Sequence, residues 1–221
     1  MKLRMRKPST SSTHTASIIL ALLLMLSTAV SATAGQRDKL LVIGDSLSAA
    51  YGIKVEDGWV ALLAERLKTE DYPIDVINSS ISGDTSANGL SRLSTLLTDY
   101  EPTIVIIELG GNDGLRGLSI KKLKSNLAQM VEQSRAAGAD VLILGVQIPS
   151  NYGAAYTRLF AESFVQVAED NNASLVPFFL GGMETSLELF QDDGIHPSAE
   201  AQPLLLDNTW QELKPMLDRA Y

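Results

Sequence analysis

The residues best suited to chemistry are a serine, an aspartate and a histidine from two separate segments. Ser46 follows an apolar run, in a turn that begins at Gly44 and that we expect to start a helix. A serine hydroxyl is a weak nucleophile until a base takes its proton. His196 is the only histidine outside the N-terminal segment, and Asp193 lies three residues before it. A turn could bring this carboxylate to the imidazole, fix its tautomer and stabilise the imidazolium that forms.

Acyl transfer also needs hydrogen-bond donors aimed at the oxygen that gains negative charge. Three donors are candidates: the backbone N–H groups of Ser46 and Gly83, and the side-chain amide of Asn112. Gly83 has no Cβ, so its backbone can approach a ligand closely. Gly110 and Gly111 would allow the turn that directs Asn112 inward. The combination predicts a site that stabilises an oxyanion.

Each of these residues by itself also has an ordinary structural explanation. Ser46 could cap a helix, and His196 could lie at a helix end. Gly83 and Asn112 could be ordinary turn residues. Function is favoured because the residues follow successive expected strands, and the carboxyl ends of parallel strands meet at one edge of a sheet.

The elements that must position these residues are strands and helices that alternate along the chain. Short apolar runs predict strands, and apolar residues at helical spacing predict helices. Strands are expected at 39–43, 74–78, 103–109, 140–146 and 174–177, and helices at 58–69, 87–100, 120–137, 155–171 and 198–217. Pro203 lies inside the last range and predicts a kink there. Because the strands are apolar along their length, both sheet faces must be covered, which predicts an α/β fold: a three-layer α/β/α sandwich with a five-stranded parallel sheet.

The first 34 residues have the pattern of a secretory signal peptide. A basic start, Met1 to Lys7, precedes the apolar run 18–26 and a small-residue cleavage site that ends at Ala34. A transmembrane anchor is disfavoured, because the apolar stretch is shorter than the ~20 residues that a spanning helix needs. We therefore expect a signal peptide at 1–34, a catalytic domain at 35–221, export to the periplasm or the exterior, and no stable membrane anchor.

Composition excludes several classes of function. The 221 residues include 18 Lys and Arg against 26 Asp and Glu, a net charge of −8. Such an acidic chain lacks the basic face that nucleic-acid phosphates require. The sequence has no cysteine, which excludes disulfides, a cysteine nucleophile and cysteine-ligated metals. We expect a monomer that acts on a small-molecule acyl substrate and binds no nucleic acid.

We predict that the protein needs no cofactor and no metal. Five aspartates near the expected site could in principle gather a hard cation: Asp45, Asp84, Asp113, Asp192 and Asp193. Asp193, however, is needed beside His196, and a nearby dication would disfavour the imidazolium. A flavodoxin-type cofactor is also disfavoured, because acidic strand ends would repel a phosphate and no phosphate-binding glycine loop is present.

Four segments together resemble the sequence blocks of the SGNH hydrolases, the GDSL esterase/lipase family. They are Gly44-Asp45-Ser46-Leu47, the Gly83 loop, Gly110-Gly111-Asn112-Asp113 and Asp193-Gly194-Ile195-His196-Pro197. The resemblance implies a flavodoxin-like fold, a Ser46–His196–Asp193 triad and an oxyanion hole formed by Ser46, Gly83 and Asn112. Segments 46–52, 109–117 and 148–156 further resemble the periplasmic multifunctional thioesterase, protease and lysophospholipase group, also described as arylesterases.

The expected function is that of a serine esterase with an acyl-enzyme on Ser46. The resemblance implies hydrolysis of carboxylic esters and thioesters, including acyl and aryl esters, acyl-CoA and lysophospholipids. Two alternatives stay open: a carbohydrate O-acetylesterase, and a non-catalytic lipid- or carbohydrate-binding module, against which the intact triad argues. Substrate contacts are expected from Leu115, Ile148, Tyr152 and Tyr156, with Leu118, Met183 and Leu187 as further apolar candidates that could equally be core residues.

Overall fold

The computed structural model describes Met1, Leu3, Met5 and residues 38–221. The predicted signal peptide therefore falls almost entirely outside the described residues. The chain divides into two units, and the second, Arg37–Tyr221, contains every helix and strand described. In the described part of the chain, no helix has the length and apolar character needed to cross a membrane.

The centre of the second unit is a sheet of five parallel strands, as predicted. The strands are β1 (Asp38–Gly44), β2 (Ile74–Asn78), β3 (Ile104–Glu108), β4 (Asp140–Leu144) and β5 (Ser174–Val176). Their order is β2-β1-β3-β4-β5, and all four pairings are parallel. This order is that of the flavodoxin-like doubly wound folds. The order changes direction between β1 and β3, so a crevice is expected beyond the carboxyl ends of these strands.

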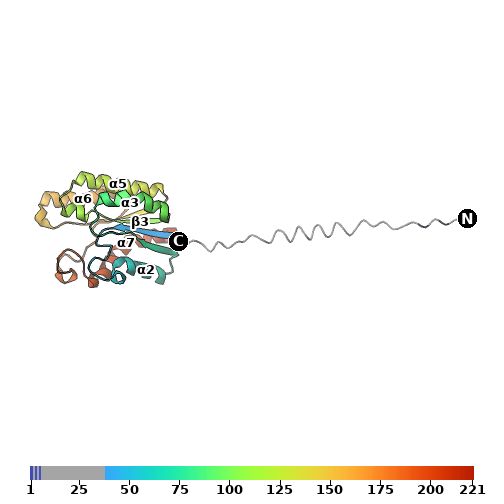
Figure 1. Cartoon of the computed structure of the whole chain (residues 1–221), viewed down its shortest axis with the longest axis horizontal. Coiled ribbons are helices and arrows are strands. Elements are labelled where there is room, and N and C mark those ends of the chain that lie inside the picture. Colours follow the sequence, from blue (N-terminus) through green and yellow to red (C-terminus); the bar gives the residue numbers. More distant parts are fainter. Residues whose placement is uncertain (2, 4, 6–37) are drawn as a thin grey trace. The chain divides into compact units, whose positions relative to one another are not determined.

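Helices cover both faces of the sheet and complete the predicted three layers (Figure 1). The long helices are α2 (Trp59–Thr69), α3 (Ser86–Tyr100), α5 (Ile120–Ala136), α6 (Ala154–Asp170) and α7 (Gln202–Ala220). Helices α3, α5 and α6 lie on one face, and α2 and α7 lie on the other (Figure 1). A short helix, α4 (Gly111–Leu115), follows β3 and was not predicted.

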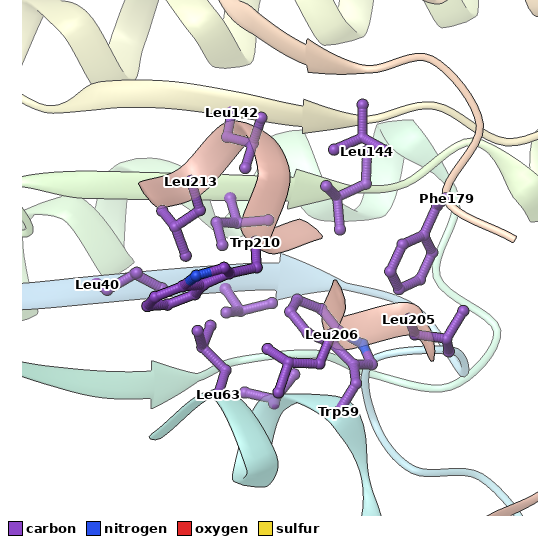
Figure 2. Packing of buried hydrophobic residues seen from close by; sticks show 14 of the residues in the cluster. Leu40, Trp59, Leu63, Leu142, Leu144, Phe179, Leu205, Leu206, Trp210 and Leu213 are labelled. Atoms are coloured by element: carbon purple, nitrogen blue, oxygen red, sulfur yellow. The ribbon is translucent and has the colours of Figure 1, made fainter. Parts of the chain in front are cut away.

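Alternate residues along each strand point to opposite faces of the sheet and pack into two separate apolar clusters. Leu40 and Val42 of β1 pack into the cluster under α2 and α7, whereas Leu41 and Ile43 pack under α3, α5 and α6. Figure 2 shows the first cluster, in which side chains of α2, α7 and the strands point into a common interior. Burying a side chain of this size stabilises the fold by roughly 1.5–3 kcal/mol. The two clusters pack against opposite faces of the sheet and so fix the positions of its strand ends.

Two predictions about local structure are wrong. Helix α7 begins at Gln202 after a 3-10 turn, so Pro203 lies in the first helical turn, where its missing N–H costs no hydrogen bond and causes no kink. Pro215 is the proline inside that helix. The helix expected after Ser46 is also absent, because residues 46–52 form successive turns. Ala50 there has a φ of 57°, which an α-helix excludes.

Candidate active site

The carboxyl edge of the sheet brings together the segments that carry the predicted site residues. Ser46 follows β1, Gly83 lies in the loop after β2, and Asn112 lies in α4 after β3. His196 comes from the loop before α7, which folds back through a bridge between Phe190 and Pro197. Residues that are far apart in the sequence therefore surround one point.

Ser46, His196 and Asp193 form a continuous chain of hydrogen bonds. His196 Nε2 lies 2.9 Å from Ser46 Oγ, and His196 Nδ1 lies 2.6 Å from Asp193 Oδ2. When Nδ1–H donates to the carboxylate, Nε2 is left with a lone pair that accepts the Ser46 hydroxyl proton. The arrangement can deprotonate a serine hydroxyl, which is the first requirement of nucleophilic catalysis.

A tight turn holds Asp193 against the imidazole. Asp193 Oδ1 accepts the backbone N–H groups of Ile195 and His196, both at 2.9 Å. Gly194, between them, has a φ of 66°, a conformation that glycine adopts without strain. Hydrogen bonds from the His196 backbone, the His196 ring and the Ile195 backbone lower the pKa of Asp193 to about 2. The carboxylate beside the imidazole is therefore ionised over the whole range in which histidine titrates.

Two residues that sequence reasoning missed support His196. The Tyr51 ring packs against the imidazole at 4.5 Å between ring centroids. Gln191 Nε2 donates to Tyr51 O at 2.8 Å and to Pro197 O at 3.0 Å, and Gln191 N donates to His196 O at 2.8 Å. Gln191 thus ties the turn after Ser46 to the histidine loop. Tyr51 lies within segment 46–52, but nothing near it in the sequence indicates a contact with His196. The bond from Gln191 to Tyr51 likewise joins residues 140 positions apart.

The three predicted oxyanion donors lie on connected segments. In the described part of the chain, the backbone N–H groups of Ser46 and Gly83 donate to no acceptor. Gly83 has a φ of 88°, and Arg116 donates to its carbonyl oxygen at 3.0 Å. Asn112 Nδ2 donates to Asp84 O, in the residue after Gly83, at 3.0 Å. The Gly83 loop is therefore held by both Arg116 and Asn112.

The turn into α4 explains why Asn112 points toward this loop. Gly110 has a φ of 125°, and a Cβ there would lie 2.9 Å from the Phe164 ring, so the sharp turn requires glycine. Asn112 Nδ2 also donates to Asp45 Oδ2 at 3.0 Å. Both amide hydrogens are thus engaged in the resting structure, so donation to a substrate oxygen requires one of these bonds to lengthen.

Beneath Ser46 lie two buried carboxyl groups, those of Asp45 and Glu108. Glu108 Oε2 accepts Ser48 Oγ–H at 2.8 Å and the Asp45 N–H at 3.3 Å, and Asp45 Oδ1 accepts the Leu47 N–H at 3.1 Å. Burial raises the pKa of Asp45 to about 6 and that of Glu108 well above its usual range. Sequence reasoning missed Glu108, because it lay inside a predicted strand.

The predicted substrate-contact residues lie together on one side of the sheet. Leu115, Ile148 and Tyr156 pack against the cluster under α5 and α6. Tyr152 Oη donates to Leu115 O at 2.9 Å, and Tyr156 Oη donates to Leu118 O at 3.1 Å. The two tyrosines thus brace the segment after α4.

Two of the further apolar candidates do not join this group. Met183 is buried in the cluster on the opposite face of the sheet. Leu187 is largely exposed in a 3-10 turn. Met183 is therefore a core residue, whereas Leu187 is not.

The aspartates named as possible cation ligands have separate partners. Asp84 pairs with Arg92 Nε at 3.0 Å, and Asp113 accepts the N–H and the hydroxyl of Ser86 at 2.8 and 2.6 Å. Asp192 is exposed on the loop. Among residues 38–221, no three Asp, Glu or His side chains converge in a group that could hold a metal ion.

Comparison with known proteins places the fold and the sequence in one family. Residues 42–203 match the GDSL-like lipase/acylhydrolase family. The chain is 53% identical to esterase TesA of Pseudomonas aeruginosa, over 80% of this chain and 89% of that protein. It is 43% identical to an arylesterase of Vibrio mimicus, over 89% of this chain and 98% of that one. It is 39% identical to thioesterase 1/protease 1/lysophospholipase L1 of Escherichia coli, over 84% of this chain and 88% of that protein.

Solved structures agree with these relatives. The crystal structure of TesA superposes with a TM-score of 0.79 at 53% identity, covering 80% of this chain and 99% of that chain. The psychrotrophic esterase EstA from Pseudoalteromonas sp., in a structure inhibited by monoethylphosphonate, gives a TM-score of 0.78 at 46% identity, covering 82% and 99%.

Proposed function

Because this chain belongs to the GDSL-like lipase/acylhydrolase family and is a carboxylic ester hydrolase, we propose that it cleaves acyl esters and thioesters through an acyl-enzyme on Ser46. The observation that carries the proposal is the hydrogen-bond chain from Ser46 Oγ through His196 to Asp193. An ionised carboxylate at one end and a hydroxyl at the other are what a serine nucleophile requires.

In the first half of the reaction, His196 Nε2 takes the Ser46 proton as Oγ attacks the acyl carbonyl carbon. The carbonyl oxygen becomes an oxyanion, which accepts hydrogen bonds from the N–H groups of Ser46 and Gly83 and from the Asn112 amide. The imidazolium then gives its proton to the departing alkoxide or thiolate. In the second half, water attacks the acyl-enzyme by the same path and returns Ser46 to its starting state.

The acyl chain is proposed to lie along the segment after α4, against Leu115, Ile148, Tyr152 and Tyr156. Leu115, Ile148 and Tyr156 share one apolar cluster, and Tyr152 donates a hydrogen bond to Leu115 O. Leu115 lies in the same short helix as Asn112, which supports the assignment. A rate profile against acyl chain length tests this assignment. Rates that rise with chain length for both ester and thioester substrates support it, whereas activity confined to acetyl esters would favour a carbohydrate O-acetylesterase.

The processing of the chain is also a proposal. Residues 1–34 act as a signal peptide that directs export to the periplasm or the exterior, and residues 35–221 form the catalytic domain, which works as a monomer. The basic, apolar and small-residue pattern of the N-terminus supports this division. N-terminal sequencing of protein recovered from the periplasm or the medium tests the cleavage site after Ala34.

The nucleophile is tested by covalent labelling. A fluorophosphonate should modify Ser46, as identified by peptide mass spectrometry, and Ser46→Ala should abolish both labelling and hydrolysis. Ser91→Ala is the matched control, because Ser91 is an exposed serine of α3 whose hydroxyl donates only to Asn88 O within its own helix. Labelling at another residue, together with an active Ser46→Ala variant, would refute the assignment.

A further inference from the structure

The two buried carboxyl groups beneath Ser46 are not used as an acid or a base in the mechanism above. Glu108 is the last residue of β3 and pairs in register with Gly44 of β1, so it lies under the turn that carries Ser46. Asp45 is 2% exposed and Glu108 is 0% exposed. Glu108 Oε2 accepts the backbone N–H of Asp45 at 3.3 Å, so the two carboxyl groups belong to neighbouring residues of the buried site.

The two carboxyl groups differ in how their oxygens are hydrogen-bonded. Asp45 accepts two hydrogen bonds, from the Leu47 N–H and from Asn112 Nδ2. Glu108 accepts two on Oε2, but its Oε1 has no hydrogen-bond partner in the described part of the chain. If Glu108 were ionised, this oxygen would be a buried carboxylate oxygen without a donor, which is costly.

No cation in residues 38–221 forms an ion pair with either carboxyl group. The titratable neighbours that influence the pKa of Asp45 are His196 and Glu108, and the one that influences the pKa of Glu108 is Asp45. Two neighbouring buried carboxyl groups, without a cation paired to either, do not both ionise near neutral pH. One of them must hold a proton.

We propose that Glu108 holds this proton as a neutral carboxylic acid and donates it to the Asp45 carboxylate, so that the pair positions the Asn112 amide for the oxyanion. Glu108 is the more deeply buried partner, and both oxygens of Asp45 accept a hydrogen bond whereas Oε1 of Glu108 accepts none. Glu108 is thus a positioning residue rather than a catalytic one.

The charge on Asp45 sets the orientation of the Asn112 amide. A carboxylate accepts hydrogen bonds only, so Asn112 must present Nδ2 to it and not its carbonyl oxygen. The same nitrogen then faces Asp84 O beside Gly83. Neutral Asp45 could instead donate to the amide oxygen and allow the side chain to turn over. This step rests on the proposed role of Asn112, whereas the protonation of Glu108 does not.

Infrared difference spectroscopy tests the proton directly, without any measurement of activity. The folded wild-type protein, above the pKa of Asp45 at about 6, should show a carbonyl band of a protonated carboxylic acid. Glu108→Gln should remove this band, and Glu132→Gln, the same change at an exposed residue of α5, should leave it in place. A wild-type spectrum without the band would overturn the proposal even if Ser46 proves to be the nucleophile.

Kinetics test the positioning role. Glu108→Gln keeps a neutral donor to Asp45 and an acceptor for Ser48, so its kcat should stay within about threefold of wild type, whereas Glu108→Leu should lower kcat by about ten- to a hundredfold with KM little changed. If Glu108→Gln lost as much kcat as Glu108→Leu, an ionised carboxylate would be required, and the proposal would be wrong. Because Glu108→Leu could fail to fold, Glu108→Gln and the wild-type infrared band decide the question by themselves.

Discussion

The site has two halves that the fold holds in different ways. The half at the strand ends contains Asp45, Glu108 and Asn112. Buried or partly buried hydrogen bonds join the residue after β1 to the end of β3 and to α4. The loop half contains Asp193 and His196, joined by hydrogen bonds within a single turn. The Asp193 side chain is 39% exposed, whereas Asp45 and Glu108 have almost no exposed surface.

This difference in burial gives carboxyl groups of the same type opposite properties. Loss of solvent raises the pKa of Asp45 to about 6 and raises that of Glu108 well above its usual range. Hydrogen bonds from the turn lower the pKa of Asp193 to about 2 while solvent still reaches it. The strand-end half therefore favours neutral polar groups, including a protonated carboxylic acid. The loop half favours a permanently ionised carboxylate beside the imidazole.

The largest expected effect comes from removing the base in the loop half. His196→Ala should lower kcat by at least ~10³-fold, the scale seen when a member of a catalytic triad is removed. Steady-state kinetics measure this loss, and circular dichroism checks that the variant folds. A well-folded variant that loses less than tenfold would make His196 a structural residue.

The next effect comes from the strand-end half. Asn112→Ala should lower kcat by about 10²–10³, or roughly 2.7–4 kcal/mol, with KM little changed, because the amide stabilises the transition state more than the ground state. Asn126→Ala, a change of the same type at an amide that donates to Ser86, is the matched control. A rise in KM with kcat unchanged would instead assign Asn112 to substrate binding.

The sequence predicted the strands and the position of the loop half well, for a physical reason. A strand covered on both faces is apolar along its length, as 104–108 is except at its last residue, so its pattern needs no knowledge of contacts. Asp193 and His196 are three residues apart, so a turn that joins them can be inferred locally. Asn112 was predictable because glycines directly before it indicated a sharp turn.

The strand-end half was only partly predictable, because its contacts are long-range. Glu108 and Asp45 are 63 positions apart, and nothing near either residue indicates the other. Arg116 reaches Gly83 across 33 positions and has the sequence context of any exposed arginine. Pro203 was misplaced because the start of α7 depends on a 3-10 turn that the apolar pattern does not show.

A smaller effect is expected on the pH dependence of the free energy of unfolding, which tests the contrast in pKa between the two halves. Glu108 keeps a proton that the unfolded chain loses above its ordinary pKa of 4.5, so wild-type stability should decline as pH rises from there through the folded pKa. Asp193 loses its proton more readily when folded, so its contribution should be present above 3.8 and lost as pH falls through about 2.

Urea unfolding over a pH series measures these slopes. The free energy of unfolding of Glu108→Gln should increase relative to that of wild type as pH rises above 4.5. That of Asp193→Asn should be lower than that of wild type above pH 3.8, by only about 0–1 kcal/mol because the group is partly exposed. Glu132→Gln should change neither slope. If both variants were more stable than wild type, or both less stable, the contrast in burial between the two halves would be contradicted.

The smallest expected effect is that of a chelator, which should leave hydrolysis unchanged. Four of the five aspartates near the site already have partners: Asp45 with Asn112, Asp84 with Arg92, Asp113 with Ser86, and Asp193 with His196. The fifth, Asp192, is exposed, and among residues 38–221 it converges with no pair of other metal-binding side chains. A dication that recruited Asp193 would draw it away from His196 and oppose the imidazolium formed in catalysis. Activity should therefore be equal before and after dialysis against EDTA, and addition of Mg²⁺ or Ca²⁺ should not raise it. Activity that vanished and returned with either ion would require a metal-activated water in place of Ser46 as the nucleophile.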